Sequence, residues 1–264
     1  MKNILVPVGS SKNAVSHLQY AVDFAESFGA NLFVVQVYNV YTKAGTMVRV
    51  DEIIERESKA FLEDLVSKID TKGVKVIVKT LKGKLIDTLE LACKAADIDL
   101  MLVEPRTNSI KDEVYLGKTS GKIVKQMDVP VLIIPEDYKF IPPSNILMAI
   151  KSAIIKKDNV LKPLKLIKTQ FDAIIDLLLV KTPFHNKGDF DVNDELKGIV
   201  KSITKTENAT TFQGVLFHFE SHKPDMLCVV RRKRGFFAKK WEKNTILKKD
   251  FHSNIPVLVL SGLK

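Results

Sequence analysis

Short apolar runs alternate along the chain with longer stretches in which apolar residues recur at helical spacing. The first run, residues 3–8, has the length of a strand. It is followed by Leu18, Val22 and Ala25, which share one face of a helix that Gly29 would end. This opening therefore predicts a strand followed by a helix.

The same alternation continues to residue 134. Apolar runs predict four more strands, at residues 32–37, 74–78, 100–103 and 131–134. The stretches between the earlier strands have the apolar spacing of amphipathic helices. Almost wholly apolar strands that are separated by helices indicate a parallel sheet covered on both faces, which is an α/β fold.

The second half of the chain repeats this plan. Residues 145–148 match 3–6, residues 225–229 match 99–103, and residues 255–258 match 129–132. The first pair is offset by 142 residues and the other two by 126, so the second copy has lost 16 residues, which we assign to the crossover around its second helix. Prolines between residues 135 and 144 mark a seam. We predict two tandem five-stranded parallel α/β sandwich domains, residues 1–141 and 142–264.

The last strand of each copy, at residues 131–134 and 257–260, is apolar. An unpaired apolar edge invites pairing with another strand. We therefore predict that the two copies pair with each other through these edges, which makes a pseudo-dimer within one chain. A further homodimer of whole chains stays open.

The positive charge is concentrated in the second copy. Residues 1–141 hold 19 basic and 19 acidic residues, whereas residues 142–264 hold 22 and 12, so the formal net charge of +10 belongs to the second copy. Six units of it lie in residues 231–243, called the basic segment below. Its candidate contact residues are Arg231, Arg232, Lys233, Arg234, Lys239, Lys240, Trp241 and Lys243.

We expect the basic segment to be a loop. One interpretation is that it docks on an anionic partner, namely nucleic acid, a membrane surface or an acidic protein. The other is a solvated loop whose aromatic residues pack on the protein itself.

The two cysteines, Cys93 and Cys228, lie far apart in apolar runs. This predicts two buried, reduced thiols and hence a cytoplasmic protein. No apolar stretch approaches the roughly 20 residues of a membrane-spanning helix, and the first residues lead directly into a strand. We therefore expect neither a transmembrane segment nor a signal peptide.

Three stretches resemble parts of the universal stress protein family. Residues 4–8 resemble its opening strand, residues 99–103 its fourth strand, and residues 116–133 its closing helix and strand. The whole chain is similar to the tandem members of that family. The resemblance implies a Rossmann-like α/β sandwich, adenine-nucleotide binding in some members, and a role in stress adaptation.

Nucleotide-binding members of this family carry Gly-x2-Gly-x9-Gly-Ser/Thr after the fourth strand. The glycines let backbone N–H groups approach phosphates, and the last pair opens a helix whose N-terminus attracts anions. The four positions hold Glu104, Thr107, Gly117 and Lys118. The family's aspartate after the first strand is Gly9 here. We therefore expect no ordinary ATP site.

A degenerate site for ATP, AMP or a small anion remains in the first domain. The resemblance places its candidate residues at Pro7, Val8, Gly9, Val37, Gly117, Lys118, Thr119 and Ser120. The alternative is that Gly117 only serves the turn, while Thr119 or Ser120 caps the helix. A P-loop is excluded, because Asp112 stands at the position where this motif requires its first glycine.

In the second copy no glycine of the family pattern is left. The corresponding positions hold Val230, Lys233, Lys243 and Asn244, and Lys151 replaces the aspartate. Bulky side chains would fill the space that phosphates need. We predict that the second copy does not bind nucleotide.

The sequence has no pattern typical of an enzyme. It lacks the Gly-x-Ser-x-Gly elbow and the Gly-x-Gly-x-x-Gly fingerprint. His218 and His222 would share a helix face, but two ligands are fewer than the three that a zinc site needs. We therefore predict a binding or regulatory protein with no metal site and no catalytic residues. The alternatives are a docking protein and, as a third interpretation, a weak ATP hydrolase.

Overall fold

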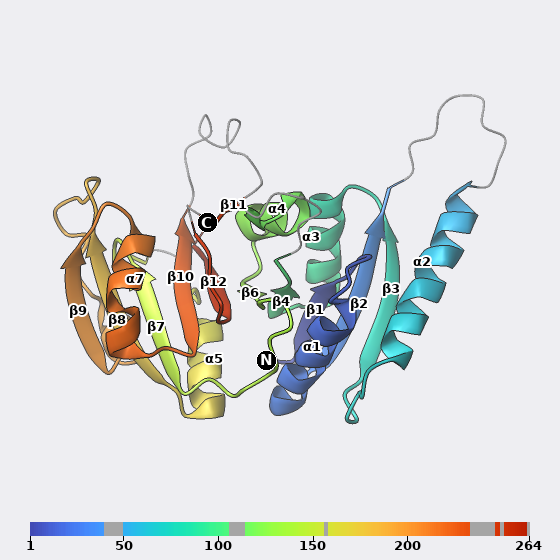
Figure 1. Ribbon diagram of the computed structural model, residues 1–264, viewed down its shortest axis with the longest axis horizontal. Coiled ribbons are helices and arrows are strands. Elements are labelled where there is room, and N and C mark those ends of the chain that lie inside the picture. The colour runs from blue at the N-terminus through green and yellow to red at the C-terminus, as the bar shows by residue number, and fades with distance from the viewer. Residues whose placement is uncertain (40–49, 106–113, 156–157, 233–245, 249–250, 263–264) are drawn as a thin grey trace.

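The computed structural model describes residues 1–39, 50–105, 114–155, 158–232, 246–248 and 251–262 (Figure 1). In the first half the strands are β1 (Asn3–Pro7), β2 (Asn31–Tyr38), β3 (Val76–Lys82), β4 (Leu100–Val103), β5 (Val114–Leu116) and β6 (Val131–Ile133). The helices of this half are α1 (Ala14–Phe28), α2 (Val50–Ser67), α3 (Leu85–Ala95) and α4 (Lys118–Gln126).

As far as β11, the second half follows the same order. Its strands are β7 (Asn145–Ile150), β8 (Ile174–Lys181), β9 (Ser202–Glu207), β10 (Met226–Arg232), β11 (Ile246–Leu247) and β12 (Val257–Gly262). Its helices are α5 (Lys162–Phe171), α6 (Asp194–Lys197) and α7 (Thr211–His222). The helix between β8 and β9 has four residues, against 18 in α2, so the predicted loss around the second helix is confirmed.

Within the described residues, ten strands form one sheet in the order β3-β2-β1-β4-β6-β12-β10-β7-β8-β9. The five strands of each half are parallel, as predicted, and the two halves have the same strand order. The sheet is therefore two similar halves placed edge to edge.

The two halves meet where β6 and β12 pair antiparallel, with Leu132 opposite Leu258 and Val131 opposite Val259. These are the apolar edges that the sequence predicts to pair. The seam between residues 135 and 144 lies between β6 and β7, and the exact domain boundary stays a prediction.

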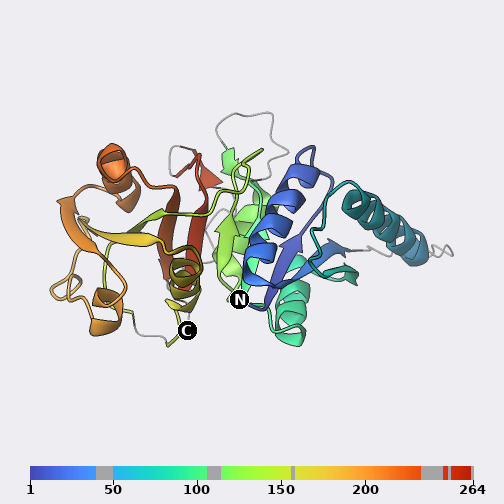
Figure 2. The ribbon, with the colours of Figure 1, turned by 90° about the horizontal axis from the view of Figure 1, so that it is seen from below.

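Helices cover both faces of the sheet, as Figure 2 shows. On one face α1, α2 and α5 bury Leu18, Leu62 and Leu164 against the strands. On the other face α3 and α7 bury Leu89 and Val215, and α4 packs there too. The hydrophobic faces of amphipathic helices thus enclose an almost wholly apolar sheet.

An aromatic cluster, called the aromatic joint below, also holds the two halves together. Phe24 and Phe28 of α1 contact Phe171 of α5, with ring centroids 6.2 Å and 5.4 Å apart. Phe140, from the connection between β6 and β7, lies 6.0 Å from Phe171 and 5.4 Å from Tyr20. Tyr20 and Phe24 are almost completely buried. The halves therefore share a core and are not independent bodies on a linker.

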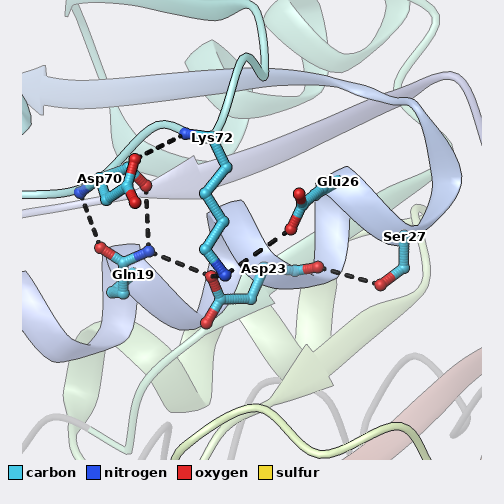
Figure 3. Close-up of polar contacts among 6 residues, drawn as sticks. All are labelled: Gln19, Asp23, Glu26, Ser27, Asp70 and Lys72. Carbon is cyan, nitrogen blue, oxygen red and sulfur yellow. Dashed lines mark hydrogen bonds and ion pairs between the residues drawn. The ribbon is translucent and has the colours of Figure 1, made fainter.

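A polar cluster on α1 fixes the turn that leads into β3 (Figure 3). The Gln19 side chain donates to the Asp70 carbonyl at 3.0 Å and accepts from the Asp70 N–H at 2.9 Å. Lys72 pairs with Asp23 at 2.9 Å. Lys72 and Gly73 have positive φ. This turn delays the third strand, which begins at Val76 and not at the predicted residue 74.

In the part of the chain that the structure describes, no helix is both long and apolar enough to cross a membrane.

Candidate functional site

The candidate site lies at the carboxyl ends of β1 and β4. These strands are neighbours, while β2 lies on the other side of β1, so the strand order reverses between them. In open α/β sheets such a reversal leaves a crevice where ligands bind. Three segments meet here, namely the loop after β1, Glu104 directly after β4, and the N-terminus of α4.

Glu104 links these segments. Its side chain is buried, and Ser11 Oγ, from the loop after β1, donates to Glu104 Oε2 at 3.1 Å. Ser120 Oγ, from the first turn of α4, donates to the Glu104 carbonyl at 2.7 Å. Ser120 is 3% exposed. A buried carboxylate therefore stands where the family pattern has a glycine that leaves room for phosphate.

Helix α4 begins directly after Gly117. Gly117 is the N-cap, with φ −66° and ψ 175°, and its carbonyl accepts the first helical bond from the Gly121 N–H at 2.8 Å. The interpretation in which Thr119 or Ser120 caps the helix is wrong, because both lie inside its first turn. The Ser120 hydroxyl donates to Glu104 instead.

The N-terminus of α4 has the features of a small-anion site. The N–H groups of a helix's first turn have no partner within the helix, and the helix dipole makes this end partly positive. The side chains of Lys118 and Thr119 are exposed there. An anion at this end would meet backbone donors and one lysine.

The remaining candidate residues approach the same edge. Pro7 ends β1, and the Val8 N–H donates to the Val35 carbonyl at 2.8 Å, so Gly9 begins the loop that carries Ser11. Val37 lies two residues farther along β2 and is partly buried. The structure thus brings Pro7, Val8 and Gly9 to the carboxyl edge at which β1 and β4 end.

Sequence reasoning missed the partners of Glu104. Ser11 does not cap α1, which begins at Ala14 with Asn13 as its N-cap residue. Ser11 Oγ accepts from the Asn13 N–H at 3.2 Å and donates to Glu104. The signal in the sequence that could have pointed to these contacts is Glu104 itself, an acidic residue where the family pattern has a glycine.

In the second copy, the segment after β8 lies against the loop after β7. The Ala153 N–H donates to the Asp189 carbonyl at 2.6 Å, and the Asn186 N–H donates to Asp189 Oδ2 at 2.7 Å. Hydrogen bonds from the Asn186 N–H and the Ser152 hydroxyl hold the pKa of the Asp189 carboxyl below its ordinary value. His185 Nδ1 lies 3.9 Å from Asp189 Oδ2. The segment after β8 thus packs against the loop after β7 at the carboxyl edge of the second half.

Arg231 and Arg232 lie in β10, so the expectation of a loop is wrong for them. The Arg231 guanidinium donates to the Val124 carbonyl at 2.5 Å, to the Met127 carbonyl, and to Ser261 Oγ at 3.3 Å. Carbonyls at a helix C-terminus carry partial negative charge and attract a cation. Arg231 is therefore an internal contact between the two halves, and the expectation that it binds an anionic partner is wrong.

The other residues of the basic segment, Lys233, Arg234, Lys239, Lys240, Trp241 and Lys243, lie outside the described residues. For them the anionic partner stays a prediction of the sequence.

The histidines and cysteines do not form a site with one another. The rings of His218 and His222 lie 5.8 Å apart, and His222 Nδ1 is 2.9 Å from the carbonyl of His218. Within the described ranges, no three His, Cys, Asp or Glu residues lie together in a way that suits a metal ion. Cys93 and Cys228 are buried and unpaired, and burial raises the pKa of the Cys93 thiol to about 12.

A profile of the universal stress protein family matches residues 1–135. The chain belongs to the universal stress protein family. With 264 residues it is about twice the size of a single domain of that family.

Relatives of this universal stress protein extend the likeness to the whole chain. A universal stress protein of Methanocaldococcus jannaschii is 20% identical over 143 residues, which are 52% of this chain and 84% of the relative. The crystal structure of a universal stress protein from Archaeoglobus fulgidus DSM 4304 has a TM-score of 0.72 at 19% identity and covers 98% of both chains. A functionally unknown protein from Pseudomonas aeruginosa PAO1 has a TM-score of 0.58 at 12% identity, with coverage of 98% and 92%. The two structures show that the fold of both halves recurs elsewhere.

Proposed function

We propose that this universal stress protein acts by binding, as a regulatory protein of the stress response. Its first half would retain a small-anion site at the N-terminus of α4 and lack a full cradle for a triphosphate. The observation that carries this proposal is the buried Glu104, whose carboxylate accepts from Ser11 of the loop after β1 and whose backbone carbonyl accepts from Ser120 of α4.

The crevice is unsuited to a chain of phosphates for two physical reasons. Backbone N–H groups reach phosphates where glycines leave room, and the Glu104 side chain fills that room against Ser11. Its carboxylate also repels each further negative charge that lies along the crevice. The N-terminus of α4 remains favourable for one phosphate group. We therefore propose a preference for inorganic phosphate or AMP over ATP.

We also propose that the site binds without hydrolysing its ligand. Phosphoryl transfer depends on metal ions that bridge the phosphates and on cations that stabilise the transition state. Among the described residues at this edge, two serine hydroxyls are engaged with Glu104, and Lys118 is the cation at the start of α4. These described groups can hold one anion, but one lysine does not replace the several positive charges that stabilise a phosphoryl-transfer transition state.

The paired edges bear on the quaternary state. The last strands of the two halves, β6 and β12, pair with each other, so neither is available to pair with a second chain. We propose a monomeric pseudo-dimer. Light scattering on the purified chain tests this, and a mass of twice 29.7 kDa at micromolar concentration would refute it.

Calorimetric titration with inorganic phosphate, AMP and ATP tests the site. We expect phosphate and AMP to bind, ATP to bind more weakly than AMP, and both Gly117→Val and Lys118→Met to weaken AMP binding. Lys59→Met, at an exposed lysine of α2, is the matched control and should leave binding unchanged. Tighter binding of ATP than of AMP, or release of phosphate from ATP that Lys118→Met abolishes, would overturn the proposal.

A further inference from the structure

The second half of the chain contacts both ends of α4, a helix of the first half. At the C-terminal end, Arg231 of β10 donates to the carbonyls of Val124 and Met127. At the other end, β11 pairs antiparallel with β5, with Ile246 opposite Leu116. Leu116 directly precedes Gly117, the N-cap of α4. The helix that carries the candidate anion site is therefore attached at both ends to the other copy.

The position of Arg231 follows from strand alternation. Leu227 and Val229 point to the face of the sheet on which α4 packs, so Arg231, two residues farther along, points there too. Arg231 lies beside Ser261 of β12, and β12 lies between β10 and β6. Because the serine side chain is small and accepts a hydrogen bond from the guanidinium, Arg231 can cross β12 and reach the first half.

A second attachment fixes the strand before α4. Tyr115 of β5 is 6% exposed, and its ring lies 5.6 Å from that of Phe251. Phe251 in turn lies 5.0 Å from Phe212, in the first turn of α7. The start of α4 is therefore connected through aromatic contacts to a helix of the second half.

Helix α4 needs such support because its sequence favours a helix poorly. It has nine residues, whereas isolated helices shorter than about 12 residues are marginal in water. Gly121 costs about 1 kcal/mol relative to alanine in a helix interior. Lys118 and Lys122 are like charges one turn apart, and such pairs are unfavourable. Contacts with other elements must therefore hold α4 in place.

We propose that Arg231 is a positioning residue that couples the second half to the anion site of the first. Its cation stabilises the C-terminus of α4, and an anion at Gly117 would stabilise the N-terminus of the same helix. Each contact raises the population of ordered α4, so each strengthens the other, as linkage requires. The ligand part of this inference rests on the proposed function, whereas the positioning of α4 by Arg231 does not.

Hydrogen–deuterium exchange on the full chain tests the positioning. In Arg231→Met we expect the amides of residues 121–126 to exchange about tenfold faster, while amides of β1 and β2 keep their wild-type rates. Arg231→Lys keeps the positive charge but cannot donate to two carbonyls in the same geometry. Its α4 exchange rates should therefore lie between those of wild type and of Arg231→Met. Lys201→Met, at an exposed lysine of the second half, is the matched control.

Two outcomes would overturn the positioning role. One is unchanged exchange of α4 in Arg231→Met. The other is equal acceleration in α4 and in the core strands, which would mean that Arg231 only contributes to global stability. If Arg231→Met does not fold, the comparison of Arg231→Lys with wild type decides between the same outcomes.

The coupling is tested with inorganic phosphate as the probe. We expect phosphate to slow α4 exchange in wild type and to bind about tenfold more weakly to Arg231→Met. Equal phosphate affinity of the two proteins would overturn the coupling. Absence of phosphate binding to wild type would overturn the coupling and the proposed anion site together, while accelerated exchange of α4 in Arg231→Met would still support its positioning role.

Discussion

Replacing Glu104 with glutamine removes a negative charge from the crevice and keeps a side-chain oxygen to accept from Ser11. Glu104 is 6% exposed, so little water screens its charge. Ser120 of α4 lies 2.7 Å from the Glu104 carbonyl, which places the first turn of α4 beside this residue. We therefore expect Glu104→Gln to bind anions more tightly.

The size of the effect follows from Coulomb's law. A phosphate on the first turn of α4 would lie about 7 Å from the carboxylate, where two unit charges repel by about 2 kcal/mol at an effective dielectric constant of about 20. This corresponds to about a 30-fold change in the dissociation constant. Adenosine carries no phosphate, so its affinity should not change.

Titration calorimetry at low ionic strength measures the effect with AMP, inorganic phosphate and adenosine. Glu57→Gln is the control, because Glu57 is exposed on α2, on the opposite face of the sheet. An AMP affinity within about twofold of wild type would refute the electrostatic argument, since the repulsion at this distance is far larger than that. An equal gain for adenosine would show that space, and not charge, limits binding.

Three further predictions concern stability and reactivity. Phe24→Ala empties a fully buried position of the aromatic joint and should lower the free energy of unfolding, measured by urea titration, by about 3–5 kcal/mol. Phe184 is 80% exposed, so Phe184→Ala should change that free energy by less than about 0.5 kcal/mol. Similar losses in the two variants would contradict this prediction. The pKa of Asp189 is lower in the folded state than in the unfolded chain, so its ionised carboxylate stabilises the fold. This contribution to the free energy of unfolding is complete above the unfolded pKa of about 4, and it is lost as the pH falls through the lower folded pKa. The thermal midpoint of Asp189→Asn should therefore drop less than that of wild type below about pH 4. The same drop in both proteins would contradict the hydrogen-bonded carboxylate. Burial raises the pKa of both Cys93 and Cys228, so neither thiol should react with iodoacetamide at about pH 8 until guanidinium chloride unfolds the chain; rapid labelling of the native protein would contradict the buried placement.

The architecture could be predicted because it depends on short-range patterns. Apolar runs and helical spacing mark most elements, and the matched segments reveal the duplication. The pairing of β6 with β12 was also accessible, since residues 131–134 and 257–260 are apolar strands that would otherwise be sheet edges. The short ladder of β5 and β11 had no such signal, because strands of two or three residues show no periodicity.

The decisive contacts of the site could not be predicted in the same way. Ser11 and Glu104 are 93 residues apart, and Arg231 reaches carbonyls 104 and 107 residues away. Nothing in a local sequence window identifies such partners. A run of cations after an apolar strand is typical of a loop, and only the register beside β12 shows that Arg231 still belongs to the strand.

The antiparallel joint of β6 and β12 has a consequence for how the two halves can change. When two identical chains associate, every substitution appears on both sides of their interface. Here both sides are encoded separately, so one side can gain a contact that the other lacks. Arg231 is such a case, because the residue at the matching position of the first half, 126 residues earlier, is Pro105, whose side chain cannot donate a hydrogen bond. The two sides of this joint can therefore diverge independently, and a substitution at Arg231 changes one half of the chain without changing the other.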